Sequence, residues 1–214
     1  MESMAPDPPS PPRYTATEAT SKSIGAGALA GAVAGFVWGG MGGRIAMRIV
    51  LLTSDDRVRG LTSDGGFEIG VISAATIFLL IATSILGTIA GLLYGFIRML
   101  LRGPRWLVAT GVGIAAAAGA GGGMLVHADG IDFQLLGPLW LTVGLFLLIP
   151  GAWGVTVVVL TERLLKSGRI HPYLPHPIDK RLWGAVGNTA GWLLLAVITA
   201  LGLLDLVRDV ARLT

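Results

Sequence analysis

Residues 24–43 read IGAGALAGAVAGFVWGGMGG, an apolar stretch in which glycine returns at every fourth position and no Lys, Arg, Asp or Glu occurs. An α-helix rises 1.5 Å per residue, so about 20 apolar residues are needed to cross the ~30 Å hydrocarbon core of a bilayer. The stretch has this length. It therefore predicts a transmembrane α-helix.

Four further stretches of similar character follow along the chain, at about 70–97, 106–126, 138–161 and 182–204. The 106–126 stretch is rich in Ala and Gly and is the least hydrophobic. Pro150 removes one helical hydrogen bond and predicts a kink in the fourth stretch. The sequence thus predicts an all-α, polytopic transmembrane helix bundle with about five spans.

The overall composition agrees with a membrane protein. Hydrophobic residues make up 53% of the 214 residues and charged residues only 14%, against roughly 25% charged in soluble domains. The net charge is +3, but the basic residues lie at the ends of apolar runs, so we expect no nucleic-acid partner. Cysteine is absent, which excludes disulfides and thiolate metal sites. We expect no cofactor and no metal.

Residues 1–23 are polar and rich in proline, a composition that cannot bury a core. They are predicted to form a disordered cytoplasmic tail, and residues 24–214 to form the transmembrane domain. The early acidic residues Glu2 and Asp7 are unlike the basic start of a signal peptide.

The Lys and Arg residues predict the orientation, because cytoplasmic loops carry an excess of them. With five spans, one side holds ten of the 16 and the other side six. We therefore expect the N-terminus in the cytoplasm and the C-terminus outside. The richer side holds Arg13, Lys22, Arg98, Arg102, Arg105, Arg163, Lys166, Arg169, Lys180 and Arg181; the other holds Arg44, Arg48, Arg57, Arg59, Arg208 and Arg212.

Glycine ladders of period four occur in several spans. Residues four apart share one helix face, so each ladder is a flat strip that lets another backbone approach closely. Packing within one protomer or between protomers of a homo-oligomer is favoured over a glycine-lined pore. The ladders are Gly27, Gly31, Gly35, Gly39 and Gly43; Gly87, Gly91 and Gly95; Gly111, Ala115, Gly119 and Gly123; and the shorter pair Gly187 and Gly191.

Arg44 and Arg48 follow the first ladder directly, and apolar residues continue after them. The helix is therefore expected to continue past Arg44. An arginine at mid-bilayer costs about 2.5–3.5 kcal/mol on insertion scales, which suggests a partner. One hypothesis is a charge cluster at the outer membrane face that binds an anionic ligand or lipid headgroup. Its candidate acidic partners are Asp55, Asp56, Asp64 and Glu68 just beyond the arginines, and Asp129 or Asp132 on the next outer loop. The other is snorkelling of both side chains to the headgroups.

Two outer loops carry further patterns. An Asp-Gly pair at Asp64-Gly65, inside 58–71, predicts either a small extracytoplasmic β-hairpin or an irregular loop. His127 with Asp129 and Asp132 could offer metal ligands, but the spacing favours a solvated loop.

The sequence contains no His-Glu-x-x-His, Gly-x-Ser-x-Gly or Walker motif and no pair of acidic residues within the spans. The favoured function is a non-enzymatic integral membrane protein of scaffold or regulatory type, with membrane lipids as partners. A channel or permease for a small solute or anion is the first alternative. An enzyme that acts on lipid is the second.

Three motifs carry a resemblance: GGRIAMR at 42–48, TSDGGF at 62–67 and DGIDF at 129–133. With these motifs, the chain resembles a group of uncharacterised multi-pass membrane proteins from actinobacteria over about residues 24–165. The resemblance implies a bacterial plasma membrane and no particular activity.

Overall fold

The computed structural model describes residues 16–54, 74–126, 133, 138–166 and 182–213. Regular secondary structure in these residues is entirely helical, as predicted. Five helices are long and apolar enough to cross a membrane, so the chain has the build of a multi-pass membrane protein. They cover Thr20–Thr53, Thr76–Ile97, Arg105–Leu125, Leu139–Lys166 and Ala185–Leu213. The predicted hairpin at 58–71 lies outside the described residues.

The first crossing is one continuous rod made of α1 (Ala16–Ala34), the π-helical segment η1 (Gly35–Gly42) and α2 (Gly43–Thr53). It continues past Arg44, as predicted, and exceeds the predicted span 24–43 at both ends. Of the predicted disordered tail, residues 1–15 lie outside the described residues, and residues 16–23 are helical. Adding residues to an existing helix avoids the cost of nucleation, so a polar segment can extend the apolar one.

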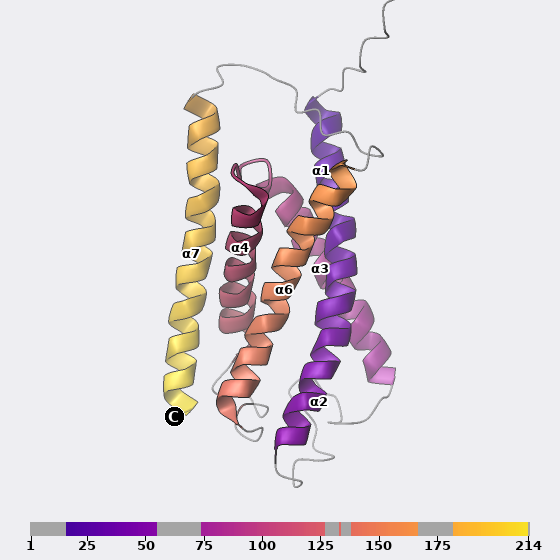
Figure 1. The fold of residues 1–214 in the computed structure, drawn as a ribbon, viewed down its shortest axis with the longest axis vertical. Helices are drawn as coiled ribbons and strands as arrows, with labels where there is room; N and C mark the ends of the chain where they lie inside the picture. Colours follow the sequence, from indigo (N-terminus) through magenta and orange to yellow (C-terminus); the bar gives the residue numbers. More distant parts are fainter. Residues whose placement is uncertain (1–15, 55–73, 127–132, 134–137, 167–181, 214) are drawn as a thin grey trace, which may run out of the picture.

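The other crossings are α3 (Ala74–Ile97), α4 (Arg105–Ala116) with its π-helical continuation η3 (Ala117–Leu125), α6 (Leu139–Lys166) and α7 (Leu182–Leu213). The helix α6 continues without a break through Pro150. Successive crossings run in opposite directions, so the start of α1 and the end of α7 lie at opposite ends of the bundle (Figure 1).

The helices form two groups joined by α6. In one group α1 and η1 pack on α3, and in the other α4 and η3 pack on α7 (Figure 1). The helix α6 contacts α1 and η1 on one side and α4 and η3 on the other. Within the described residues, α3 makes few contacts with α4 or α7.

The first two glycine ladders pack against each other within the chain. A Cβ atom added to Gly31 would overlap the carbonyl oxygen of Gly87 and lie 2.8 Å from the Cα of Gly91. The relation is mutual, since a Cβ on Gly91 would lie 2.8 Å from the Cα of Gly31. The predicted close packing of these spans is therefore present, and it is intramolecular. The same strip includes Gly27, Gly35 and Gly95.

Within the π-helical segment the first ladder loses its backbone contact with α3 and then leaves this interface. A Cβ on Gly39 would still lie 2.9 Å from the Cβ of Thr83 on α3, whereas one on Gly43 would have nothing within 4 Å. A π-helix bonds i to i+5, so a spacing of four residues drifts around its axis. The same happens in η3, where Gly119 would meet Ile198 while Gly123 has only ordinary contacts at 3.8 Å. Gly43 and Gly123 thus do not take part in the predicted tight packing.

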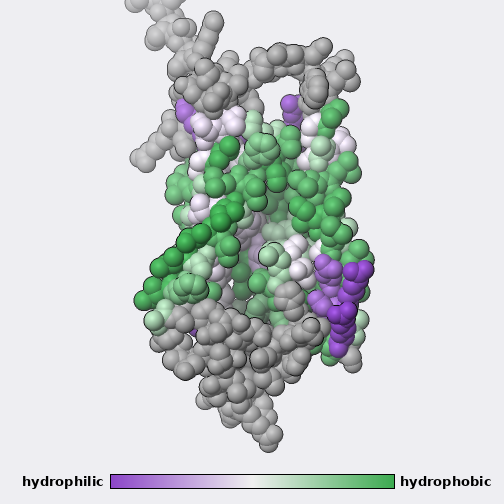
Figure 2. All heavy atoms as spheres, turned by 180° about the vertical axis from the view of Figure 1, so that it is seen from behind, coloured by the Kyte–Doolittle hydropathy of each residue, from purple (hydrophilic) through white to green (hydrophobic). Residues whose placement is uncertain are grey.

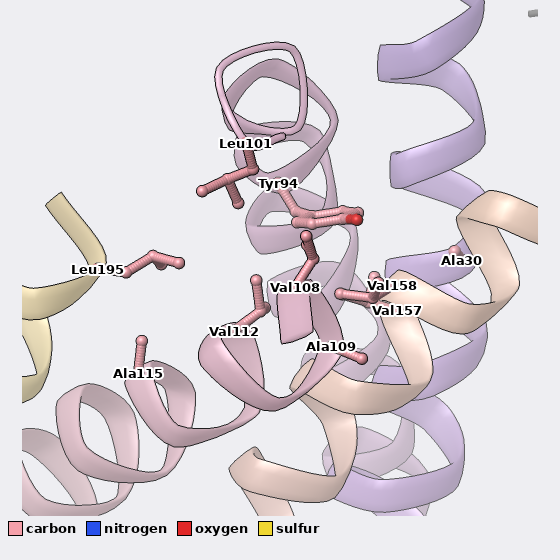
Figure 3. Packing of buried hydrophobic residues seen from close by; sticks show 10 residues of the cluster. All are labelled: Ala30, Tyr94, Leu101, Val108, Ala109, Val112, Ala115, Val157, Val158 and Leu195. Atoms are coloured by element: carbon pink, nitrogen blue, oxygen red, sulfur yellow. The ribbon is translucent and has the colours of Figure 1, made fainter. Parts of the chain in front are cut away.

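The buried core gathers side chains from all five crossings (Figure 3). Val108 and Val112 of α4 meet Tyr94 of α3 and Val157 of α6, each at most 7% exposed. Outside this core, large apolar side chains such as Phe78 (67%) and Leu193 (59%) are exposed. They cover the middle of the molecule in Figure 2. Such a surface suits hydrocarbon rather than water as the surrounding medium.

Candidate functional site

An apolar groove with a volume of about 390 Å³ lies between the two helix groups. Its wall on α3 extends from Thr83 to Ile97, which corresponds to about 21 Å along a helix. Small residues on the facing wall, such as Ala116 and Ala120, leave the space open. The groove is open along one side, and Figure 2 shows the apolar surface hollowed there.

The groove exists because α3 is held away from α4. The glycine strip draws α3 onto α1, while α4 and η3 pack on α6 and α7. Trp153 of α6 lies between the two groups and lines the groove. Its Nε1 donates a hydrogen bond of 3.3 Å to the carbonyl oxygen of Gly31, which holds the indole in place.

Tyr94 lies near one end of the groove. It is 4% exposed, and its hydroxyl has no hydrogen-bond partner among the described residues. Figure 3 shows the hydroxyl directed towards Val157 and Val158 of α6. One helical turn further, the backbone amide of Arg98 donates a hydrogen bond of 2.7 Å to the carbonyl oxygen of Tyr94. The groove therefore ends close to the charged end of the bundle.

Arg98 forms an ion pair with Glu162 of α6 at this end. Its Nε donates a hydrogen bond of 2.8 Å to Oε1 of Glu162, and a terminal guanidinium nitrogen lies 2.7 Å from the same oxygen. Both side chains are 21% exposed. The pair fastens the end of α3 to α6 beside the groove.

Further basic side chains lie close to this pair along the chain. Arg102 and Arg105 lie on the connection from α3 to α4, and Arg163 and Lys166 on the last turn of α6; all four are exposed. The guanidinium of Arg105 donates a hydrogen bond of 3.0 Å to the carbonyl oxygen of Val159. This bond holds the guanidinium against α6. We call Arg102, Arg105, Arg163 and Lys166 the basic rim.

The α3–α4 connection is fastened to α7. The backbone amide of Arg102 donates a hydrogen bond of 2.7 Å to Oδ1 of Asn188. Nε1 of Trp192 donates a hydrogen bond of 3.4 Å to the carbonyl oxygen of Arg102. Gly103 has a φ of +155°, a value that L side chains rarely adopt. The polar Asn188 therefore helps to hold the backbone of Arg102 in position.

Replacing Asn188 by Leu removes this acceptor and should lower the free energy of unfolding by about 1 kcal/mol. Hydrogen exchange at the amide of Arg102 should rise at the same time. Asn188→Asp keeps the acceptor and is the matched control. Unchanged exchange in the Leu variant would mean that Trp192 alone holds the connection.

Two of the sequence-predicted ligand residues, Arg44 and Arg48, lie at the other end of the bundle from the Arg98–Glu162 pair. Arg44 is half-buried and its guanidinium donates a hydrogen bond to Oγ1 of Thr76, while Arg48 is exposed. Asp129 and Asp132 lie outside the described residues, as does His127. The described residues therefore do not test a common site of the four predicted ligand residues, and this site stays a prediction. In the described part of the chain, no cluster of three His, Cys, Asp or Glu suits a metal ion.

Sequence reasoning missed the groove and the ion pair. Glu162 directly follows the predicted fourth span, and it pairs with an arginine 64 residues earlier. The available signal was an acidic residue on the side richest in arginine. Comparison with protein-family models, with curated proteins and with solved structures finds no match for this chain in any of the three.

Proposed function

We propose that the protein is a non-enzymatic integral membrane protein of scaffold or regulatory type that holds one lipid chain in its lateral groove. The observation that carries the proposal is the apolar groove between α3 and α4, open along one side and about 390 Å³ in volume. In a membrane this opening faces hydrocarbon. Walls without contacting atoms lose dispersion energy, so an acyl chain is the natural occupant.

The proposed setting is the bacterial plasma membrane, with the N-terminus in the cytoplasm. The distribution of Lys and Arg supports this orientation. The resemblance to actinobacterial membrane proteins supports the bacterial setting.

Two observations disfavour the channel alternative. The glycine faces of α1 and α3 contact each other, so they line no open path between them. The groove itself is apolar along its length, whereas ion and solute pathways carry polar groups. Self-association through the α1 and α3 ladders would require these helices to separate first.

The test is lipid retention by the purified protein, measured by native mass spectrometry. Ala90 lines the groove, whereas its neighbour Ile89 is 51% exposed and does not line it. Ala90→Phe should fill the groove and reduce retained lipid about tenfold or more. Ile89→Phe adds an aromatic ring to the outer face and should leave retention unchanged.

A second filling variant, Ala120→Phe, acts from the opposite wall. Thermal unfolding of each variant in detergent shows whether the fold is kept. If folded Ala90→Phe and Ala120→Phe retain as much lipid as the unchanged protein, the groove is not a lipid site and the proposal is wrong.

A further inference from the structure

We propose that the lipid is anionic, with its acyl chain in the groove and its phosphate bound by the basic rim. This inference rests on the proposed function and adds the headgroup that the site selects. The groove alone cannot select a lipid, because all acyl chains are as apolar as the groove wall and as the bilayer around it. Selection must come from the polar end.

Two residues of the basic rim, Arg102 and Arg105, follow the end of the groove along the chain. Ile97 is the last groove residue on α3, and Arg98 follows it directly. The connection that carries Arg102 then leads to Arg105 at the start of α4, and α4 begins to line the groove seven residues later, at Val112. An acyl chain in the groove would thus bring its headgroup to the turn that links the two walls.

The charges at this end of the groove are complementary to a phosphate. Glu162 is committed to Arg98, which it holds with two contacts under 3 Å. The basic rim keeps its positive charge: among the described residues, no salt bridge joins Arg102, Arg105, Arg163 or Lys166 to a carboxylate. Arg105 uses one terminal nitrogen on Val159 and retains further N–H donors, since a guanidinium has five.

Two residues of the rim, Arg102 and Arg105, are also held in place before any lipid binds. Asn188 and Trp192 fix the backbone of Arg102, and the bond to Val159 fixes Arg105. Prior ordering lowers the entropic cost of binding a headgroup. Arginines that served only to orient the protein in the membrane would need no such fastening.

The experiment is a competition between phosphatidylglycerol and phosphatidylcholine with the same acyl chains, added in equal amounts to the full-length protein. Native mass spectrometry gives the ratio of the two bound lipids. We expect phosphatidylglycerol to be favoured about tenfold or more, since basic side chains near a surface each attract anionic lipid. Arg102→Gln combined with Arg105→Gln should bring the ratio close to one.

The control is Arg208→Gln combined with Arg212→Gln, which removes two exposed arginines from the opposite end of α7. It should leave the ratio unchanged. Equal binding of both lipids by the unchanged protein, or an equal loss of preference in the control, would overturn this inference alone. Retention of neither lipid by folded protein would overturn the proposed function as well.

Discussion

Gly31→Ala should destabilise the protein by about 3 kcal/mol or more, although the change adds only one methyl group. The new Cβ would overlap the carbonyl oxygen of Gly87 and press on the Cα of Gly91 at 2.8 Å. Both neighbours are backbone atoms, which cannot rotate away as a side chain can. The helices α1 and α3 must therefore move apart, and overpacking of this kind costs at least 1–3 kcal/mol. Unfolding by denaturant in detergent micelles measures the loss.

Gly43→Ala on the same continuous helix is the matched control. A Cβ there has nothing within 4 Å, and Ala is a better helix former than Gly by roughly 1 kcal/mol in water. This variant should be as stable as the unchanged protein or slightly more stable. Equal stability of Gly31→Ala and Gly43→Ala would show that the two ladders are not in backbone contact.

The separation of α1 and α3 has a second expected consequence. Gly35 and Gly87 belong both to the strip and to the groove lining, so movement of α3 changes the width of the groove. Folded molecules of Gly31→Ala should therefore also retain less lipid. Stability and lipid retention are coupled through this one helix contact.

Glu162→Leu should lower the free energy of unfolding by about 2 kcal/mol, which is the second large expected effect. It leaves the guanidinium of Arg98, which is 21% exposed, without its carboxylate. Breaking a fully buried ion pair costs 3–5 kcal/mol, and partial exposure at the membrane edge reduces that value. The thermal midpoint in detergent should fall accordingly.

The double variant Arg98→Leu with Glu162→Leu should recover most of the loss, because neither charge then lacks a partner. Arg163→Gln changes an exposed position next to Glu162. Its free energy of unfolding should stay within about 0.5 kcal/mol of that of the unchanged protein. The single variant Arg98→Leu completes the comparison. If the stability losses of Arg98→Leu and Glu162→Leu simply add in the double variant, Arg98 and Glu162 are not energetically coupled.

The π-helical segments show why period-four patterns predict packing only where the helix is regular. Gly27, Gly31 and Gly35 lie in α1 or at its junction with η1, and all three pack on backbone atoms of α3. Gly43 belongs to the same pattern but follows η1, which rotates it off that face. Nothing in the local sequence of 35–42 distinguishes a π-helix from an α-helix, since glycine permits both.

The number of spans, their approximate positions and the continuation of the first helix past Arg44 followed from the sequence alone. These properties depend on hydrophobicity and length, which each segment carries in its own residues. The pairing of the α1 and α3 ladders, the groove, and the Arg98–Glu162 contact were decided only by the tertiary structure. Each depends on which face of one helix meets which face of another. Arg98 and Glu162 lie far apart in the chain, so the sequence around either residue does not predict their contact.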